Sequence, residues 1–186
     1  TDGRHSGGYF NGRVVEENPI LLALVASEMV ARANGAGVNT KEIDRVVGPA
    51  MGAIELAHSI ARNIHRVSGK LCFSSYTEKE RDKMVFRTSY VRPGENVLVV
   101  EDTITTGGSV SKVVDAVLEA GGIPLPILPV ISNQTGLRDV RGMKILSVVE
   151  RKIETWAPEE CPLCKVGSEA LRPPKAWDNW RRLTAE

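Results

Sequence analysis

The alternation of apolar and polar residues along the chain predicts a regular succession of helices and strands. Asn18 and Pro19 have the residue types of a helix cap and a first helical position, and residues 20–35 continue as a helix that ends at a glycine. Residues 45–47 form a short apolar run that predicts a buried strand. A second helix over residues 53–67 carries these apolar residues on one face: Ile54, Ala57, Ile60, Ala61 and Ile64.

The second half of the chain continues this alternation. Residues 70–76 predict a strand, residues 84–91 a strand or hairpin arm, and residues 97–100 a strand covered on both faces. Residues 127–131 and 144–149 predict two further strands. Between them a third helix, stopped by two glycines, has apolar residues at helical spacing: Val110, Val113, Val114, Val117 and Leu118. Strands that alternate with helices predict an α/β fold with a mainly parallel central sheet flanked by helices.

Composition and charge narrow the class of protein. The 186 residues, of which 42% are hydrophobic, suit a single domain that spans residues 1–186. The net charge of +1 does not indicate nucleic-acid binding, and no apolar run approaches the ~18 residues of a membrane span. Three cysteines do not predict a disulfide scaffold, and the polar start is not typical of a signal peptide. We therefore expect a cytoplasmic protein with neither nucleic-acid nor membrane partners.

Two adjacent acids, Glu101 and Asp102, follow the apolar run 97–100, where the carboxyl end of a parallel strand forms ligand sites. The small residues after them expose backbone N–H groups at a helix start, which favours an anion such as phosphate. Thr105, Thr106 and Ser109 add hydroxyl donors. Two carboxylates suit a hydrated Mg²⁺ or sugar hydroxyls. A phosphorylated sugar would therefore bind both the carboxylates and the loop that favours phosphate. A plain strand, turn and capped helix is the alternative, but paired acids at a buried strand end are costly without a ligand.

Residues 97–110, VLVVEDTITTGGSV, closely resemble the phosphoribosyl pyrophosphate (PRPP) signature of the type I phosphoribosyltransferases. That signature has four apolar residues, two acids, two further residues and then T-T-G-G-S. Residues 1–13 resemble the entry segment of the orotate-specific members, residues 48–57 their pyrophosphate loop, and residues 160–167 a C-terminal element of some bacterial members. The resemblance implies the type I phosphoribosyltransferase fold, with a small hood segment at residues 1–16 and a tail at residues 151–186.

The same resemblance implies a reaction. Such enzymes transfer ribose 5-phosphate from PRPP to a nitrogenous base with Mg²⁺ and release pyrophosphate. Orotate is the first expectation for the base, which would give orotidine 5-phosphate in pyrimidine synthesis. Two alternatives remain open, namely a related enzyme for another base and a PRPP-sensing regulator with the same fold.

Site residues also follow from the resemblance. Glu101 and Asp102 would face the ribose hydroxyls and bind Mg²⁺, mainly through PRPP and water. The charged residues 77–83 would form a mobile loop that closes over the neighbouring active site of a homodimer. The catalytic residues would be Lys79, Arg81, Lys83 and Asp102, and the base would contact Tyr9, Phe10 and Asn133. The PRPP-binding set would be Glu101, Asp102, Thr103, Thr105, Thr106, Gly107, Gly108, Ser109, Ala50, Met51, Gly52 and Arg87.

Two positions depart from the pattern of the orotate enzymes. Thr1 stands where they usually carry a lysine or arginine, and Asn133 stands where an arginine grips the orotate carboxylate. Losing a bidentate arginine at a carboxylate site is not conservative. Either the base lacks a carboxylate, or Arg138 or Arg141 replaces the missing arginine from the same loop.

Cys161 and Cys164 have the spacing of one half of a zinc site. Four ligands are needed, so Cys72 and a histidine, or a second subunit, would have to complete it; a reduced pair in a tight turn is the alternative. We expect His5 in a solvated loop and the other two histidines, His58 and His65, at the surface or the edge of the core. Trp177 and Trp180 predict a small patch that docks on the protein itself or on a second subunit.

Overall fold

The structure of this chain, a computed structural model, describes residues 3–170. It divides into two compact units. Unit 1 consists of Thr1–Tyr9 and Ile153–Glu186, and unit 2 consists of Phe10–Lys152. The predictions for Thr1, Trp177 and Trp180 fall outside the described residues.

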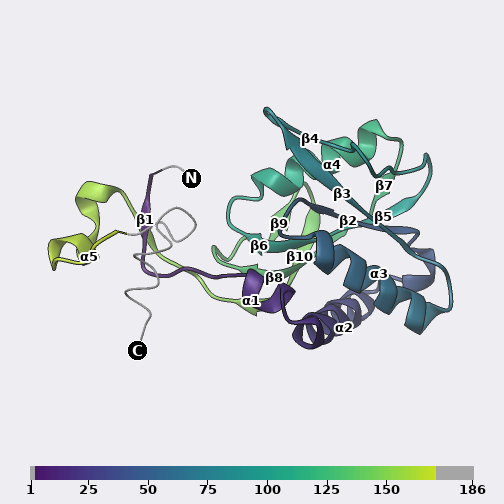
Figure 1. Cartoon of the computed structure of the whole chain (residues 1–186), viewed down its shortest axis with the longest axis horizontal. Coiled ribbons are helices and arrows are strands. Elements are labelled where there is room, and N and C mark those ends of the chain that lie inside the picture. The colour runs from purple at the N-terminus through teal and green to yellow at the C-terminus, as the bar shows by residue number, and fades with distance from the viewer. Residues whose placement is uncertain (1–2, 171–186) are drawn as a thin grey trace. The chain divides into compact units, whose positions relative to one another are not determined.

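The main helices of unit 2 form where the sequence predicts them (Figure 1). Helix α2 (Pro19–Gly35) starts at Asn18, whose side chain accepts hydrogen bonds from the backbone N–H groups of Ile20 and Leu21, both at 3.1 Å. Helix α3 (Ile54–Ser68) ends at a left-handed glycine. Helix α4 (Gly108–Glu119) buries the predicted valines, but Leu118 is 50% exposed. The short elements α1 (Arg13–Glu16) and η1 (Thr40–Glu42) complete the set.

The strands of unit 2 form two mainly parallel sheets. One has the order β4-β3-β2-β5-β7 and the other the order β6-β8-β10-β9. Only the pairs β3–β4 and β9–β10 are antiparallel among the described residues of this unit. The α/β fold class is thereby confirmed. The strands are β2 (Arg45–Pro49), β3 (Phe73–Glu80), β4 (Lys83–Val85), β5 (Asn96–Val99), β6 (Glu101–Ile104), β7 (Ile123–Pro124), β8 (Ile127–Asn133), β9 (Asp139–Val140) and β10 (Met143–Glu150).

The chain passes from one sheet to the other at Val100, between β5 and β6. The Val100 N–H donates to the carbonyl oxygen of Val47 at 2.9 Å, while Glu101 pairs with Val130 of β8. The two acids therefore follow the end of β5, as predicted. Residues 103 and 104, predicted as loop, are strand instead, because β8 supplies a partner for the chain after it leaves β5.

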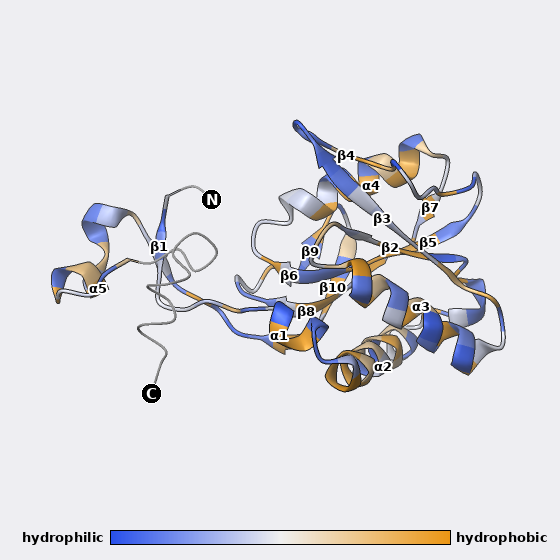
Figure 2. Ribbon diagram, viewed as in Figure 1, coloured by the Kyte–Doolittle hydropathy of each residue, from blue (hydrophilic) through white to orange (hydrophobic). Residues whose placement is uncertain are grey.

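Strand β5 is buried on both faces. Its residues alternate between two core clusters. Leu98, and Val100 just after the strand, pack with the helices α2 and α3. Val97 and Val99 pack with α4. The helices α2 and α3 thus cover one face of this sheet and α4 covers the other (Figure 1). Hydrophobic residues accordingly run along β2, β5 and α2 (Figure 2).

Residues 77–83, predicted as a mobile loop, form a hairpin in this structure. Residues 77–80 continue β3, and the pairing of Glu80 with Lys83 leaves a two-residue turn at Arg81 and Asp82. A run of charged residues does not determine backbone conformation. Here β4 supplies the hydrogen-bond partner that turns the charged run into a strand.

Unit 1 joins residues from both ends of the chain. Strand β1 (His5–Ser6) pairs antiparallel with β11 (Thr155–Trp156), and the short helices η2 (Pro158–Glu160) and α5 (Pro162–Lys165) follow. Residues 10–16, assigned to the hood from the sequence, group with unit 2 instead.

None of the helices within residues 3–170 combines the length and the apolar character that crossing a bilayer requires.

Candidate functional site

Two backbone segments closely approach the carboxylate of Asp102. A Cβ atom added to Gly12 would lie 2.8 Å from Asp102 Oδ2, and one added to Gly52 would lie 2.9 Å from the same oxygen. Both distances are shorter than real Cβ contacts, so a side chain at either position would push the Asp102 carboxylate away. The start of α1 and the turn after β2 are therefore built to approach this carboxylate closely.

Two further carboxylates surround Asp102, and both are buried. Glu101 and Glu16 are each 6% exposed, and Oε1 of Glu16 has no hydrogen-bond partner among the described residues. Burial raises the pKa of Glu101 well above its usual value, and the hydrogen bond and charge of Asp102 raise it further. Burial, followed by the charge of Asp102, raises the pKa of Glu16 to about 7, although Arg13 lies 3.0 Å away. A bound cation would offset the negative charge of these clustered carboxylates.

The donor set at this place fits Mg²⁺. The ion prefers carboxylate oxygens and water and is usually held by one or two carboxylates plus phosphate oxygens of the substrate. Glu101 and Asp102 supply carboxylates, and Oε1 of Glu16 has no hydrogen-bond partner among the described residues, although Arg13 pairs with Oε2 of the same carboxylate.

The loop before α4 offers backbone N–H groups to an anion. Thr105, Thr106 and Ser109 are exposed, and no side chain caps the first turn of α4. Gly107 has φ 76°, and a Cβ there would lie 2.6 Å from Val140 Cγ2. The loop is also fixed from behind, because Thr135 Oγ1 donates to the Thr105 carbonyl at 2.7 Å. The predicted phosphate site is therefore an open loop on a rigid support.

The turn after β2 is the third part of the site. Gly48 is in close contact with Ala53, where an added Cβ would meet Ala53 Cβ at 2.6 Å, so the chain doubles back within five residues. The Ala50 N–H donates to the Thr77 carbonyl at 2.7 Å, the peptide bond between Ala50 and Met51 is cis, and the Met51 side chain is exposed. This turn reaches the same carboxylate through Gly52.

The cations of the hairpin fall into two groups. Lys83 lies 3.7 Å from Glu119, and Arg87 lies 2.9 Å from Glu80 and 3.9 Å from Glu78. Lys79 and Arg81 are exposed and form no ion pair with another residue in the range 3–170. In this conformation the last two are therefore free to meet an anion.

The residues predicted to contact the base fall in both units. Tyr9 belongs to unit 1, whereas Phe10 and Asn133 belong to unit 2, where Phe10 packs against the cluster under α2 and α3. Asn133 is 2% exposed; its Nδ2 donates to the Leu137 carbonyl at 2.8 Å, and its Oδ1 accepts from the Gly136 N–H at 3.1 Å. The hydrogen bonds of the Asn133 amide are therefore made within the loop of residues 133–137.

The two arginines of that loop differ in their partners. Arg141 forms an ion pair with Asp115 on α4 and donates to the Ser111 carbonyl. Arg138 is exposed and has no ion pair with any described residue. Of the two, Arg138 is the one available to a ligand.

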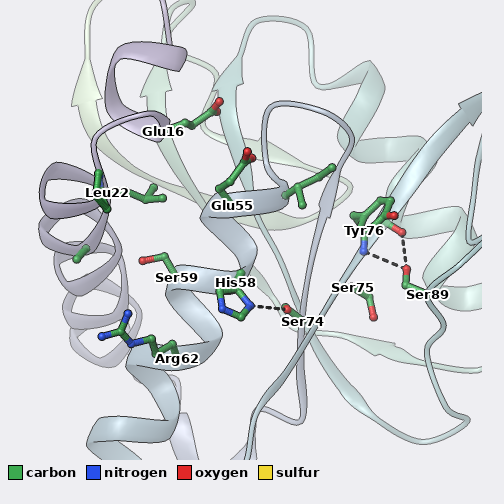
Figure 3. Close-up of a pocket in the computed structure, with 13 residues that line it drawn as sticks. Glu16, Leu22, Glu55, His58, Ser59, Arg62, Ser74, Ser75, Tyr76 and Ser89 are labelled. Carbon is green, nitrogen blue, oxygen red and sulfur yellow. Dashed lines mark hydrogen bonds between the residues drawn. The ribbon is translucent and has the colours of Figure 1, made fainter.

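A cavity of about 520 Å³ lies between α2, α3 and β3, with Glu16 and Glu55 near one end (Figure 3). His58, predicted at the surface or the edge of the core, is exposed; it lines this cavity, and its Nδ1 lies 3.4 Å from Ser74 Oγ. None of the predicted PRPP-binding residues lines this cavity, so it is not the predicted site. Of the three acids Glu16, Glu101 and Asp102, only Glu16 also lines this cavity.

Sequence reasoning missed two residues of the site, Gly12 and Glu16. Glu16 lies in a run of ordinary polar residues, and Gly12 is one of several glycines near the start of the chain. Neither has a spacing that indicates chemistry. Only the three-dimensional approach of α1 to Asp102 identifies them.

Comparisons with known proteins give a consistent result. A family model described as the phosphoribosyl transferase domain matches residues 15–124. Over 174 residues, 93% of this chain, the sequence is 37% identical to the orotate phosphoribosyltransferase of Pelotomaculum thermopropionicum and 36% identical to that of Desulforamulus reducens; in each case 85% of the relative is covered.

Solved structures agree on the fold. The orotate phosphoribosyltransferase from Aeropyrum pernix matches with a TM-score of 0.62 at 18% identity, over 76% of this chain and 78% of that one. The enzyme from Mycobacterium tuberculosis in complex with inorganic phosphate matches with a TM-score of 0.61 at 22% identity, over 78% and 81%. At these identities the structural likeness establishes the fold.

Proposed function

The chain belongs to the phosphoribosyltransferase family, and from this premise we propose that it transfers ribose 5-phosphate from PRPP to orotate, giving orotidine 5-phosphate and pyrophosphate. The protein is a pentosyltransferase of the type I fold. Orotate is the acceptor that the names of its relatives indicate.

The close approach of Gly12 and Gly52 to Asp102 is the observation that carries the proposal. It supports a site in which the acids face the ribose hydroxyls of PRPP, the turn of residues 50–52 faces pyrophosphate, and the loop before α4 receives the 5-phosphate. The N–H groups of Gly107, Gly108 and Ser109 would bind that phosphate, with the hydroxyls of Thr105, Thr106 and Ser109 adding hydrogen bonds.

Breaking the bond between ribose C1 and pyrophosphate leaves a cationic sugar and a highly charged leaving group. The carboxylates of Glu101 and Asp102 orient the ribose hydroxyls and offset the positive charge that develops on the ring. When bound, Mg²⁺ would neutralise charge on the phosphate oxygens. The chain supplies preorganised charges, and the transfer needs no protein nucleophile.

Lys79 and Arg81 are the cations best placed to neutralise the departing pyrophosphate, since neither has an acidic partner in the hairpin conformation. Lys83 and Arg87 would first have to leave their glutamates. In the proposed working enzyme, a homodimer, the hairpin reaches the active site of the neighbouring subunit and excludes water from it.

The acceptor site departs from the orotate pattern at Asn133, whose amide is used within its own loop. Arg138 is the proposed replacement for the missing arginine, because Arg141 is engaged by Asp115. If this arginine does not bind a carboxylate, the second candidate is transfer to a base that lacks one.

The protein is proposed to work in the cytosol, since Cys72, Cys161 and Cys164 are free thiols in the structure and suit a reducing compartment.

An assay of pyrophosphate release tests the proposal. The protein would be mixed with Mg²⁺, PRPP and either orotate or uracil, which is orotate without its carboxylate. Release with orotate and not with uracil is the expected result. Release only with a base that lacks a carboxylate would select the second candidate. Saturable PRPP binding without release from any base would mark a regulator and overturn the enzymatic proposal.

A further inference from the structure

The described part of unit 1 has almost no hydrophobic core of its own. Within residues 3–9 and 153–170, Cys161 is the only hydrophobic residue that is buried, at 2% exposed. The regular structure of these residues is a two-residue pairing of β1 with β11 and two short helices. Units of this size rarely fold on apolar burial alone, and natural ones add a disulfide or a structural metal.

Three metal-binding side chains meet inside this unit. His5 of β1 lies beside Cys161 and Cys164, and the ligand atoms of the three residues all lie within 4.8 Å of one another. His5 Nδ1 is 3.2 Å from Cys164 Sγ. These residues come from opposite ends of the chain, so the cluster is a product of folding and cannot be seen as a sequence motif.

The dimensions of the cluster suit zinc. Zinc–sulfur bonds of about 2.3 Å and zinc–nitrogen bonds of about 2.0–2.1 Å in a tetrahedron place neighbouring ligand atoms ~3.3–3.8 Å apart. The three ligand atoms lie within 4.8 Å of one another, and His5 Nδ1 is 3.2 Å from Cys164 Sγ, which is close to this range. Small side-chain rotations therefore suffice to close the site around an ion.

The surroundings leave room for a fourth ligand. A cavity of about 130 Å³ borders all three side chains, which is enough for a water molecule.

Cys72 does not belong to this cluster. It is 8% exposed in the core of unit 2, and burial raises its pKa to about 12. The sequence left Cys72 and an unspecified histidine as partners of the CxxC pair. The structure instead brings His5 to the pair, although it was expected in a solvated loop.

We propose that His5, Cys161 and Cys164 bind one Zn²⁺ ion, with water as the fourth ligand, and that this ion holds β1 against α5. Binding replaces the two thiol protons, which pass to solvent, and involves no change of oxidation state. The ion is structural, distinct from the Mg²⁺ proposed for the acidic group of unit 2, and ties residues 159 positions apart in the chain.

Metal analysis of the full chain, produced without a histidine tag, tests the proposal. We expect about one zinc per chain after dialysis, and a thiolate-to-metal charge-transfer band in the near ultraviolet when Co²⁺ replaces zinc. Cys161→Ser, Cys164→Ser and His5→Ala should each lower zinc affinity at least ~10-fold. The matched controls Cys72→Ala and His65→Ala should retain the zinc content of the wild type.

Two results would overturn the proposal. One is a wild-type chain that fails to bind zinc or Co²⁺ at micromolar metal in reducing buffer. The other is a chain isolated without zinc in which thiol titration finds one reactive cysteine of three under denaturing conditions, because that result would indicate a Cys161–Cys164 disulfide. Both measurements use the wild type and no substrate. Their outcome therefore depends neither on the folding of the variants nor on the proposed reaction.

Discussion

At the scale of single residues, the site depends on how closely backbone approaches one carboxylate. Asp102 is surrounded by two glycines, at which a Cβ would press on its carboxylate, and by two buried acids, Glu16 and Glu101. Such an arrangement is unfavourable for stability, because burial opposes the charged form of each acid. A ligand that supplies a cation and hydroxyl groups would offset this unfavourable burial of the acids.

Gly12→Ala tests that approach. Gly12 has φ −59°, which alanine adopts freely, so the only obstacle to the methyl group is Asp102 Oδ2 at 2.8 Å. We expect PRPP affinity to fall at least ~10-fold, about 1.4 kcal/mol of binding free energy, with little loss of thermal stability. The control is Gly35→Ala at the end of α2, where an added Cβ meets no atom within 4 Å. Equal PRPP affinities for both variants, measured by calorimetry, would contradict the geometry.

Glu16→Gln tests the charge on the buried acids. The pKa of Glu16 is about 7 in the folded chain against 4.5 for an ordinary glutamate. Between these values the folded chain binds more protons than the unfolded chain, so stability falls as pH rises through this window. Without Mg²⁺ and PRPP, the variant should therefore gain melting temperature over wild type at pH 8, and the gain should shrink towards pH 5.

The control for this prediction is the exposed neighbour Glu17→Gln, whose melting temperature should follow the wild type across the same pH range. A Glu16→Gln difference that stays constant from pH 5 to pH 8 would mean that Glu16 does not titrate as described.

At the scale of elements, local patterns predicted what local physics determines. The capping side chain of Asn18, the apolar faces of α3 and α4, and the two-sided burial of β5 are all visible in the sequence. The TTGGS run predicted the loop before α4 for the same reason, since a left-handed glycine and a bare helix start are local requirements.

Elements that depend on a distant partner could not be predicted in the same way. Strand β6 exists because β8 pairs with it, and the hairpin exists because β4 pairs with β3. Likewise, Glu16 and Gly12 join the site only because α1 packs close to Asp102. The charged residues 77–83 carried no information on their pairing, so the loop prediction was wrong for the backbone of this structure.

Arg81→Gly separates the role of the hairpin from its stability. Arg81 has φ 53°, a conformation that costs a non-glycine residue ~1 kcal/mol or more and that glycine adopts freely. The melting temperature should therefore stay the same or rise, while kcat falls roughly 10-fold or more through loss of the cation. Arg141→Gly, the same change at the same φ in the β9–β10 turn, is the control and should retain activity. Full activity of Arg81→Gly would remove this arginine from the catalytic set.

At the scale of the whole molecule, the question is which subunit supplies the hairpin to each active site. The proposed homodimer uses the hairpin of one subunit over the acids of the other. The site residues Glu101 and Asp102 and the hairpin cations would then belong to different chains of one active site.

Mixing two variants of low activity decides this arrangement. Asp102→Asn lacks the ribose-binding acid, and should lose on the order of 100-fold in kcat; Arg81→Gly lacks the hairpin cation. If the hairpin acts in trans, one of the two active sites of a mixed dimer has an intact Asp102 and receives an intact hairpin. After subunit exchange, the activity of the mixture should therefore exceed the sum of the separate variants. Activity that stays at the sum of the separate variants would show that each subunit uses its own hairpin or that no dimer forms.

The central claim is that bare backbone N–H groups before α4 and the acids at the start of β6 together bind PRPP. A crystal structure of the protein with PRPP and Mg²⁺ tests it most directly. The account predicts the 5-phosphate against the N–H groups of residues 107–109 and the ribose hydroxyls within hydrogen-bonding distance of Glu101 and Asp102. PRPP bound elsewhere, such as in the cavity between α2 and α3, with this loop occupied by the protein's own side chains, would contradict it.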